Sequence, residues 1–394
     1  MDQKSNLEFS GSYSLNAAPA AAGKFALQED GLRVKPKEGA ALFYSLRDIV
    51  EFSGADYRVS LVMFSGEKLV LAELGHDYED FLRLLAKKRN ELIISDLLIK
   101  EKVRLGDVKA EMAGVPCELR IYETALVIMP DKAELIRLPL ADIADNRQAD
   151  YRLIVKTLAG QEFIFSMMGS WLDPFSRELQ TALAELSLRA QTLLKSLSPG
   201  LSPDALLRLA EIFREGRGAS KSEVEKLAAG LWPVLEQTLS GAVEQGDLKY
   251  LFSLADRERV QFGLKRGLGG GGEADYLWAL IPLPQYKAVA LEAASLNAEA
   301  EEGRATYFFR AGEADLTQLV RALCEINFRR EPVYLPAEKL AEPEYQRYKF
   351  SIARLPGLRL LRERFLGRAI HSDAEQWKNS VVELLGIEPK KEAS

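Results

Sequence analysis

The stretch Gly267–Gly272 reads GLGGGG and holds glycines at the spacing G-x-G-x-x-G, which suits the turn of a dinucleotide-binding site. Such a turn holds a pyrophosphate only when a strand leads in and a helix leads out, because the helix N-terminus binds the phosphates. The downstream segment Tyr276–Ile281 is followed by Pro282 and Pro284, which disfavour a helix. Glu273 stands where a P-loop would need lysine. We therefore expect two antiparallel strands joined by a loop, and no cofactor.

Residues for nucleophilic or metal-dependent chemistry are few. The only histidines are His76 and His371, and the two cysteines, Cys117 and Cys324, lie far apart. Neither pair has the spacing of a metal site, and the motifs H-E-x-x-H and G-x-S-x-G do not occur. The sequence thus predicts no catalytic residues, no metal and a non-enzymatic protein. An enzyme with a site near the Gly-rich loop is a third-ranked alternative.

A basic segment at residues 329–368 carries ten cationic residues against five glutamates, with aromatic residues between them. Such a segment could follow a phosphate backbone while its rings stack on bases, or it could be a helix surface that faces water or an acidic partner. The whole chain has a net charge of -6, which argues against a dedicated nucleic-acid binder. The candidate partner-binding residues in this segment are Arg347, Lys349, Arg359, Arg362 and Arg364.

A repeat organises the first half of the chain. The tetrapeptide Ala55–Arg58 recurs as Ala149–Arg152, a shift of 94 residues. The same shift aligns further matches, namely Glu29, Leu32 and Pro36 with Glu123, Leu126 and Pro130; Leu46, Asp48 and Ile49 with Leu140, Asp142 and Ile143; Gly66 with Gly160; Gly75 with Gly169; and Phe81 and Leu85 with Phe175 and Leu179. A single register over this length indicates a duplicated domain. At the repeated Asp-Tyr-Arg we expect the tyrosine to pack and the aspartate to cap a turn, with a ligand site as the alternative.

Each copy has strand-like segments followed by one amphipathic helix. The expected strands are residues 25–28, 31–36, 41–52, 57–64 and 68–74 in the first copy, and 117–122, 125–130, 134–143, 151–158 and 162–168 in the second. In the second helix, Asp173 and Pro174 are start signals. This order of elements resembles the pleckstrin-homology-like (PH-like) fold, which implies a small β-barrel closed at one end by its C-terminal helix.

The resemblance also bears on ligands. PH-like domains that bind phosphoinositides use clustered basic residues, and only the first copy offers a loose set, Lys24, Arg33, Lys35 and Lys37. The sequence therefore disfavours a phosphoinositide or membrane partner. Domains that resemble this fold often bind proteins through a sheet edge or beside the helix, which requires no particular motif.

The second half begins after SLSPGLSP, residues 196–203, which reads as a linker. Ser202 and the Ser220/Glu223 capping box predict two helices, and Trp232-Pro233 a kink or a new helix. Four strands with helices are expected beyond them, and Ser372 to Glu375 reads as a capping box for a last helix.

The predicted fold class is α+β. We expect a first PH-like domain at residues 1–110, with 1–24 a partly flexible tail, and a second at 111–197. A helical connector at 203–247 and an antiparallel-sheet α+β domain at 248–394 follow. The favoured function is a cytoplasmic adaptor that binds a partner protein through its tandem domains, with the C-terminal domain adding a contact or a homodimer interface. The alternative is a nucleic-acid-associated protein that uses residues 329–368.

Overall fold

The computed structural model describes residues 8–97, 101–242, 245–266, 274–296, 304–311, 316–325, 331–371 and 373–387. The chain forms two compact units. The first comprises Met1–Leu138, Asp142–Leu179 and Glu338–Arg354, and the second Pro139–Ala141, Gln180–Ala337 and Leu355–Ser394. Among the described helices, none is both long and apolar enough to cross a membrane.

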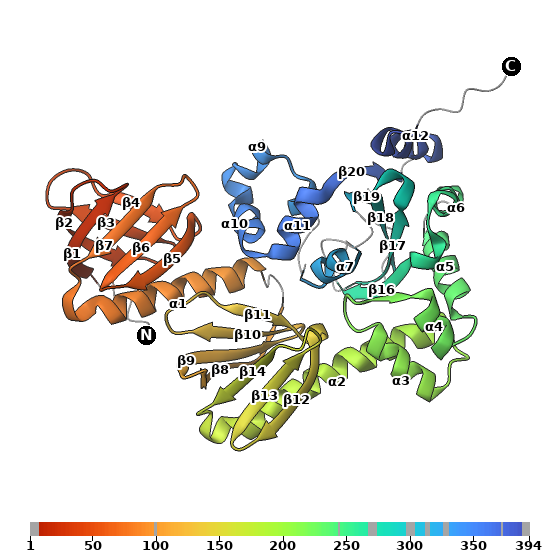
Figure 1. Ribbon diagram of the computed structural model, residues 1–394, viewed down its shortest axis with the longest axis horizontal. Helices are drawn as coiled ribbons and strands as arrows, with labels where there is room; N and C mark the ends of the chain where they lie inside the picture. The colour runs from red at the N-terminus through yellow and green to blue at the C-terminus, as the bar shows by residue number, and fades with distance from the viewer. Residues whose placement is uncertain are drawn as a thin grey trace. The chain divides into compact units, whose positions relative to one another are not determined.

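The first unit opens with a seven-stranded antiparallel sheet, drawn red to orange in Figure 1, in the order β4-β3-β2-β1-β7-β6-β5. Its elements are β1 (Glu8–Leu15), β2 (Ala21–Leu27), β3 (Gly31–Pro36), β4 (Leu42–Ser45), β5 (Ile49–Ala55), β6 (Arg58–Met63), β7 (Lys68–Ala72) and helix α1 (Tyr78–Leu97). In β6, Val59, Leu61 and Met63 alternate inward onto the core, which also holds Phe81 and Leu85 of α1. We call residues 8–97 the first module.

The second module, residues 103–179, repeats this layout with the strand order β11-β10-β9-β8-β14-β13-β12. Its elements are β8 (Val103–Met112), β9 (Val115–Tyr122), β10 (Ala125–Pro130), β11 (Ile136–Pro139), β12 (Ile143–Ala149), β13 (Arg152–Thr157), β14 (Glu162–Ser166) and the start of helix α2 (Leu172–Leu197). Two sheets with the same order agree with a tandem duplication.

Three expectations for these modules need correction. The sheets are open and not closed barrels, because the edge strands β4 and β5, and likewise β11 and β12, are not paired with each other. Strand β1 begins at Glu8, inside the segment predicted as a partly flexible tail, and β8 crosses the boundary predicted at residue 110. Both first strands were missed because Ser, Gly and Lys interrupt their alternation of apolar residues.

Helix α1 packs on both modules. Asn90 donates from Nδ2 to Ala133 O (3.0 Å) and accepts from Leu135 N (3.0 Å) in the second module. The fully buried Arg89 donates to Ile49 O and Val50 O at 3.0 Å each, and to Glu134 Oε2 at 2.8 Å. Burial, and then the charge of Arg354, lower the pKa of Arg89 to about 10. The polar side chains of Arg89 and Asn90 therefore bind α1 to the second module.

A segment from far along the chain completes the first unit. It contains η6 (Pro343–Tyr345) and helix α10 (Gln346–Arg354), preceded by α9 (Ala337–Leu340), and α10 packs against α1. Arg354 donates from Nη1 to Glu134 Oε2 (2.9 Å) and from Nη2 to Ile49 O. The first module is thus covered on one side by a C-terminal helix.

The second unit is an α+β structure around a six-stranded sheet in the order β15-β16-β17-β18-β19-β20. Its strands are β15 (Gly218–Ser220), β16 (Gln261–Arg266), β17 (Asp275–Leu283), β18 (Ala288–Ser295), β19 (Ala305–Arg310) and β20 (Phe365–Ile370). Its helices are α3 (Pro203–Ile212), α4 (Lys221–Leu227), α5 (Leu231–Ala242), α6 (Gln245–Leu254), α7 (Leu316–Glu325), α8 (Glu331–Tyr334), α11 (Pro356–Arg364) and α12 (Ala374–Leu385).

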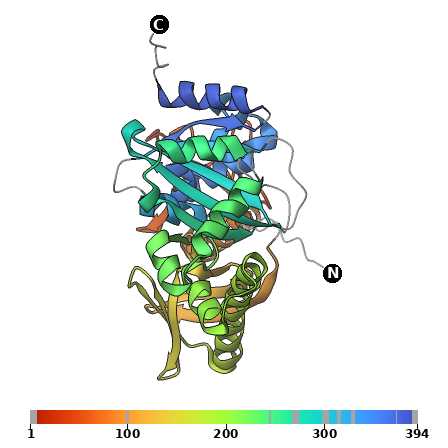
Figure 2. The same cartoon turned by 90° about the vertical axis from the view of Figure 1, so that its right-hand side faces the viewer.

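Strand β17 is buried along its whole length, since the green helices α5 and α6 cross the sheet in Figure 2 and α7 also packs on this strand. The caps at Ser202 and Ser220/Glu223 are confirmed, and α5 starts anew at Leu231. The predicted four strands are six, because β15 and β20 add edges. The last helix is capped by Asp373, and Ser372, the predicted start of a capping box, lies outside the described residues.

Candidate partner-binding surface

The repeated Asp-Tyr-Arg forms a hairpin turn in each module. Asp56 and Tyr57 have φ of 50° and 56°, and Asp150 and Tyr151 have 50° and 58°. Positive φ at both central residues is the type I′ pattern, which matches the twist of the flanking strands but usually takes Asn-Gly. Neither tyrosine is buried, since Tyr57 is 74% exposed and Tyr151 is 92% exposed, and the packing expected for both is seen only as a ring contact of Tyr57. Bulky residues in this strained conformation are candidates for a functional role.

At this end of the second module, large apolar side chains face solvent. Met167, directly after β14, is 74% exposed, and Trp171, directly before α2, is 48% exposed. Gln148 Nε2 donates to Leu172 O (3.5 Å), which ties the β12–β13 hairpin to the start of α2. We call Tyr151, Met167 and Trp171 the apolar tip.

The first module has the same backbone arrangement here but different side chains on its surface. The shift of 94 residues places Glu73 and Asp77 where the second module has Met167 and Trp171. The backbone is shared, since Glu73 and Met167 have φ of 59° and 56°. Tyr57 rests on the ring of Tyr78 at 5.4 Å, whereas Leu172 stands at that second position in the other module. Only the second module therefore combines tyrosine, methionine and tryptophan, residue types enriched at protein interfaces.

A pocket of about 590 Å³ adjoins the apolar tip through chain neighbours, because Arg152 follows Tyr151 and Ser166 precedes Met167. It is lined by Met112, Ala113, Gly114, Arg152, Glu162, Phe163, Ile164 and Ser166. Apart from the repeat, no sequence pattern pointed to this pocket.

The five basic residues predicted as partner-binding lie in different units. Arg347 and Lys349 belong to α10 in the first unit, and Arg359, Arg362 and Arg364 to α11 in the second. Arg347 and Arg359 are exposed, and Lys349 Nζ lies 4.6 Å from the centre of the Phe64 ring.

Other members of the basic segment serve packing. Arg362 donates from Nη1 to Pro332 O (2.9 Å), and burial lowers its pKa. Arg364 lies 3.4 Å from Gln318 Oε1. The rings of Tyr348 and Phe350 are buried, so they offer no face on which bases could stack.

A buried network around His371 was missed because its members are far apart in the sequence. His371 Nδ1 lies 3.0 Å from Asp247 Oδ2, and His371 Nε2 lies 3.1 Å from Glu292 Oε2. Thr306 Oγ1 donates to Glu292 Oε2 (2.6 Å) and accepts from Trp377 Nε1 (3.0 Å). Burial alone would lower the pKa of His371, but the hydrogen bonds and charges of Glu292 and Asp247 outweigh it and raise that pKa above 6.5.

This network resembles an acid–base site but is closed to solvent. The side chains of His371, Asp247 and Glu292 are 5% exposed or less. Among the described residues, no group of three or more His, Cys, Asp or Glu side chains has an arrangement that could hold a metal ion. Because these side chains are buried, we interpret the network as a structural element of the second unit.

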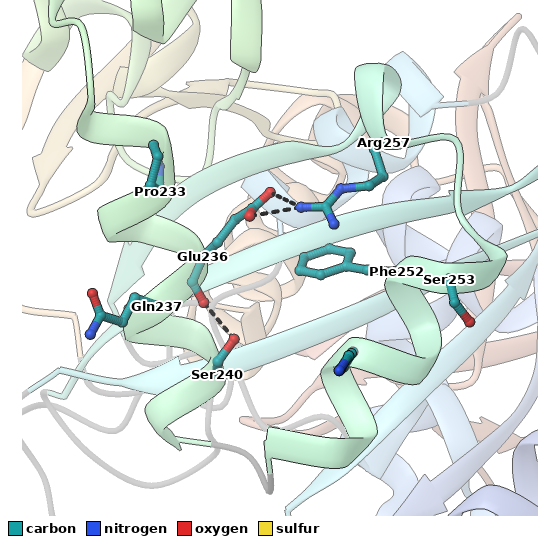
Figure 3. A pocket seen from close by; sticks show the side chains of 8 residues that line it. Pro233, Glu236, Gln237, Ser240, Phe252, Ser253 and Arg257 are labelled. Atoms are coloured by element: carbon teal, nitrogen blue, oxygen red, sulfur yellow. Dashed lines mark hydrogen bonds and ion pairs between the residues drawn. The ribbon is translucent and has the colours of Figure 1, made fainter.

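A second pocket, of about 490 Å³, lies between α5 and α6 (Figure 3). Its acidic group is fully engaged: Glu236 accepts from Arg257 Nη2 at 2.8 Å on both oxygens and from Trp232 Nε1 at 2.9 Å. The Arg257 guanidinium also lies 4.7 Å from the centre of the Phe252 ring. These groups satisfy one another, which makes the pocket a weaker candidate than the apolar tip.

The Gly-rich stretch Gly267–Gly272 lies outside the described residues, as do Arg329 and Arg330 and the side chain of Cys324. Strands β16 and β17 on either side of the glycines are antiparallel partners, as predicted. The strand β17 thus follows the glycines in the sequence where a dinucleotide site would need a helix.

No family model matches the chain, and no curated protein matches it either. Among solved structures, the "Structure of the Spt16D Pob3N heterodimer" matches with 17% sequence identity and a TM-score of 0.17, over 39% of this chain and 84% of that chain. A TM-score this low supports no inference about function.

Proposed function

We propose that the chain is a non-enzymatic, cytoplasmic adaptor whose two modules are PH-like and whose second module binds a partner protein through the apolar tip. The observation that carries the proposal is the exposure of Tyr151, Met167 and Trp171 at one end of a module whose twin has acidic residues at two of these three positions. Exposed apolar groups of this kind commonly mark protein contacts. Seven antiparallel strands followed by a helix support the PH-like assignment. Arg347 and Arg359, both exposed, are proposed as accessory contacts.

The proposal is tested by site-specific photo-crosslinking in the cells that make the protein. A photoreactive amino acid replaces Tyr151, Met167 or Trp171, one at a time, and the matched controls carry it at Tyr57, Glu73 or Asp77. We expect one protein to be captured from all three tip positions and from none of the controls. Equal capture from both modules would reject the proposal.

A purified pair then gives the affinity. The double variant Met167→Glu/Trp171→Asp gives the tip the residues of the first module. It should weaken binding of the captured protein, while Glu73→Ala/Asp77→Ala should not.

A further inference from the structure

The ladder between the first and last strands is shorter in the second module. There, β14 pairs with β8 at two positions, and the pairing stops at Phe165↔Met112. In the first module, β7 pairs with β1 at four positions and the ladder extends to Leu15↔Leu69. The stretch Glu162–Ile164 therefore has no strand beside it on the β8 side among the residues that the structure describes.

The gap arises from a tight turn. Met112 is followed by Ala113 and Gly114 with φ of 52° and 77°, and the chain returns at once, with Val115 opposite Met112. In the first module β1 continues beyond its last pair with β2, Tyr13↔Ala21, and so covers β7.

Main-chain groups point into this gap. Thr157 N donates to Gln161 O (2.8 Å), so the alternation of an antiparallel ladder directs Phe163 towards β13, and Glu162 and Ile164 away from it. In the first module the residue equivalent to Glu162 is Lys68. Lys68 O accepts from Asn16 N (2.9 Å), and Lys68 N donates to Asn16 Oδ1 (2.8 Å).

Side-chain burial also indicates the gap beside Glu162–Ile164. Leu69 is fully buried in the first module, where Leu15 is its cross-strand partner. Its equivalent Phe163 is only partly buried, and Ile164 is 39% exposed. Both line the pocket of about 590 Å³, together with Met112 at the end of β8.

We propose that the edge Glu162–Ile164 binds an extended segment of a partner protein as an added antiparallel strand, with an apolar side chain resting on Phe163. The protein's own first module shows what fits, because Ser14–Asn16 occupies the equivalent place with main-chain pairing and a central leucine. This inference rests on the proposed function in taking a protein as the partner, but it uses a different set of atoms from the apolar tip.

The test uses the full chain and a synthetic capped heptapeptide with the sequence of Ser12–Ala18. By the first-module geometry, its residues equivalent to Ser14 and Asn16 donate N–H groups to β14, whereas the Leu15 N–H points away. N-methylation at Ser14 should weaken binding by about tenfold, since it removes a donor and leaves an acceptor unpaired, while N-methylation at Leu15 should not. The variant Ile164→Pro, which removes a protein N–H facing the gap, should weaken the unmodified peptide similarly.

Saturable binding that slows hydrogen exchange at Glu162 and Ile164, with this methylation pattern, supports the proposal. No saturable binding, or equal effects of the two methylations, overturns it; neither result depends on whether Ile164→Pro folds. The tip variant Met167→Glu/Trp171→Asp should bind the peptide normally. If the peptide fails while crosslinks from the tip persist, only the strand-addition inference fails; the reverse pattern rejects only the tip.

Discussion

The two modules share a strand order and a turn geometry, yet they differ at their surfaces. In the first, β1 covers β7 fully, acidic residues occupy the tip, and helix α10 packs against α1. In the second, β14 keeps an open stretch and the tip is apolar. The same strand order is therefore compatible with two different surfaces. Strand order depends on the inward-facing residues, whereas binding depends on the exposed edges and turns.

The largest effect is expected from Arg89→Ala. Its guanidinium donates to Ile49 O and Val50 O of the β5 edge and to Glu134. Its removal takes this donor from Val50 O and leaves Arg354 as the remaining donor to Ile49 O and Glu134. We expect a loss of about 3 kcal/mol in the free energy of unfolding. Chemical denaturation measures it, with the exposed Lys87→Ala on the same helix as control, for which the loss should be below about 0.5 kcal/mol. Equal losses would mean that the contacts of Arg89 do not stabilise the first module.

Giving the second module the tip residues of the first should weaken partner binding. Met167→Glu/Trp171→Asp should cost about 1.4 kcal/mol or more in binding, a tenfold rise in Kd for the crosslinked partner, as measured by calorimetry. Because both side chains are exposed, the unfolding free energy should stay within about 0.5 kcal/mol. An unchanged Kd would show that the difference between the two tips does not determine partner binding.

The turns offer a test in which stability and binding change in opposite directions. Asp150→Asn/Tyr151→Gly supplies the residues that a type I′ turn favours, so it should stabilise the chain by about 1 kcal/mol while weakening partner binding. In the first module, Asp56→Asn/Tyr57→Gly loses the ring contact with Tyr78, so its gain should be smaller and binding should not change. Thermal unfolding and calorimetry measure both; a tip that keeps full affinity without Tyr151 would show that the strained tyrosine has no binding role.

The buried His371 network should affect stability alone. Because the folded pKa is raised above 6.5, its contribution is complete below that pH and is lost as pH rises through the folded pKa. We expect His371→Gln to flatten this part of the pH dependence of unfolding, followed by denaturation at several pH values, with no change in partner binding at the tip. A variant that keeps the wild-type pH profile would contradict the assignment.

The sequence predicts the repeat, the helices that follow clear caps and most strands, because periodic apolar residues and caps such as Ser202 are local signals. It does not predict α6 or α8 to α11. It does not predict β1 or β8, whose alternation is broken by small and charged residues. The type I′ turns were hidden because Asp-Tyr is an unusual choice for positive φ. The open edge of β14 depends on where β8 stops, and the His371 network depends on contacts of His371 with residues 65 to 124 positions away; both are set by tertiary structure.

The central claim is that β1 covers the whole of β7 in the first module, whereas β8 leaves Glu162–Ile164 of β14 uncovered in the second. Residue-resolved amide hydrogen exchange in the free protein tests this claim most directly. We predict slow exchange at Lys68 and Val70, whose main-chain groups face β1, and fast exchange at the equivalent Glu162 and Ile164. Equal protection at the two pairs of amides would contradict the account.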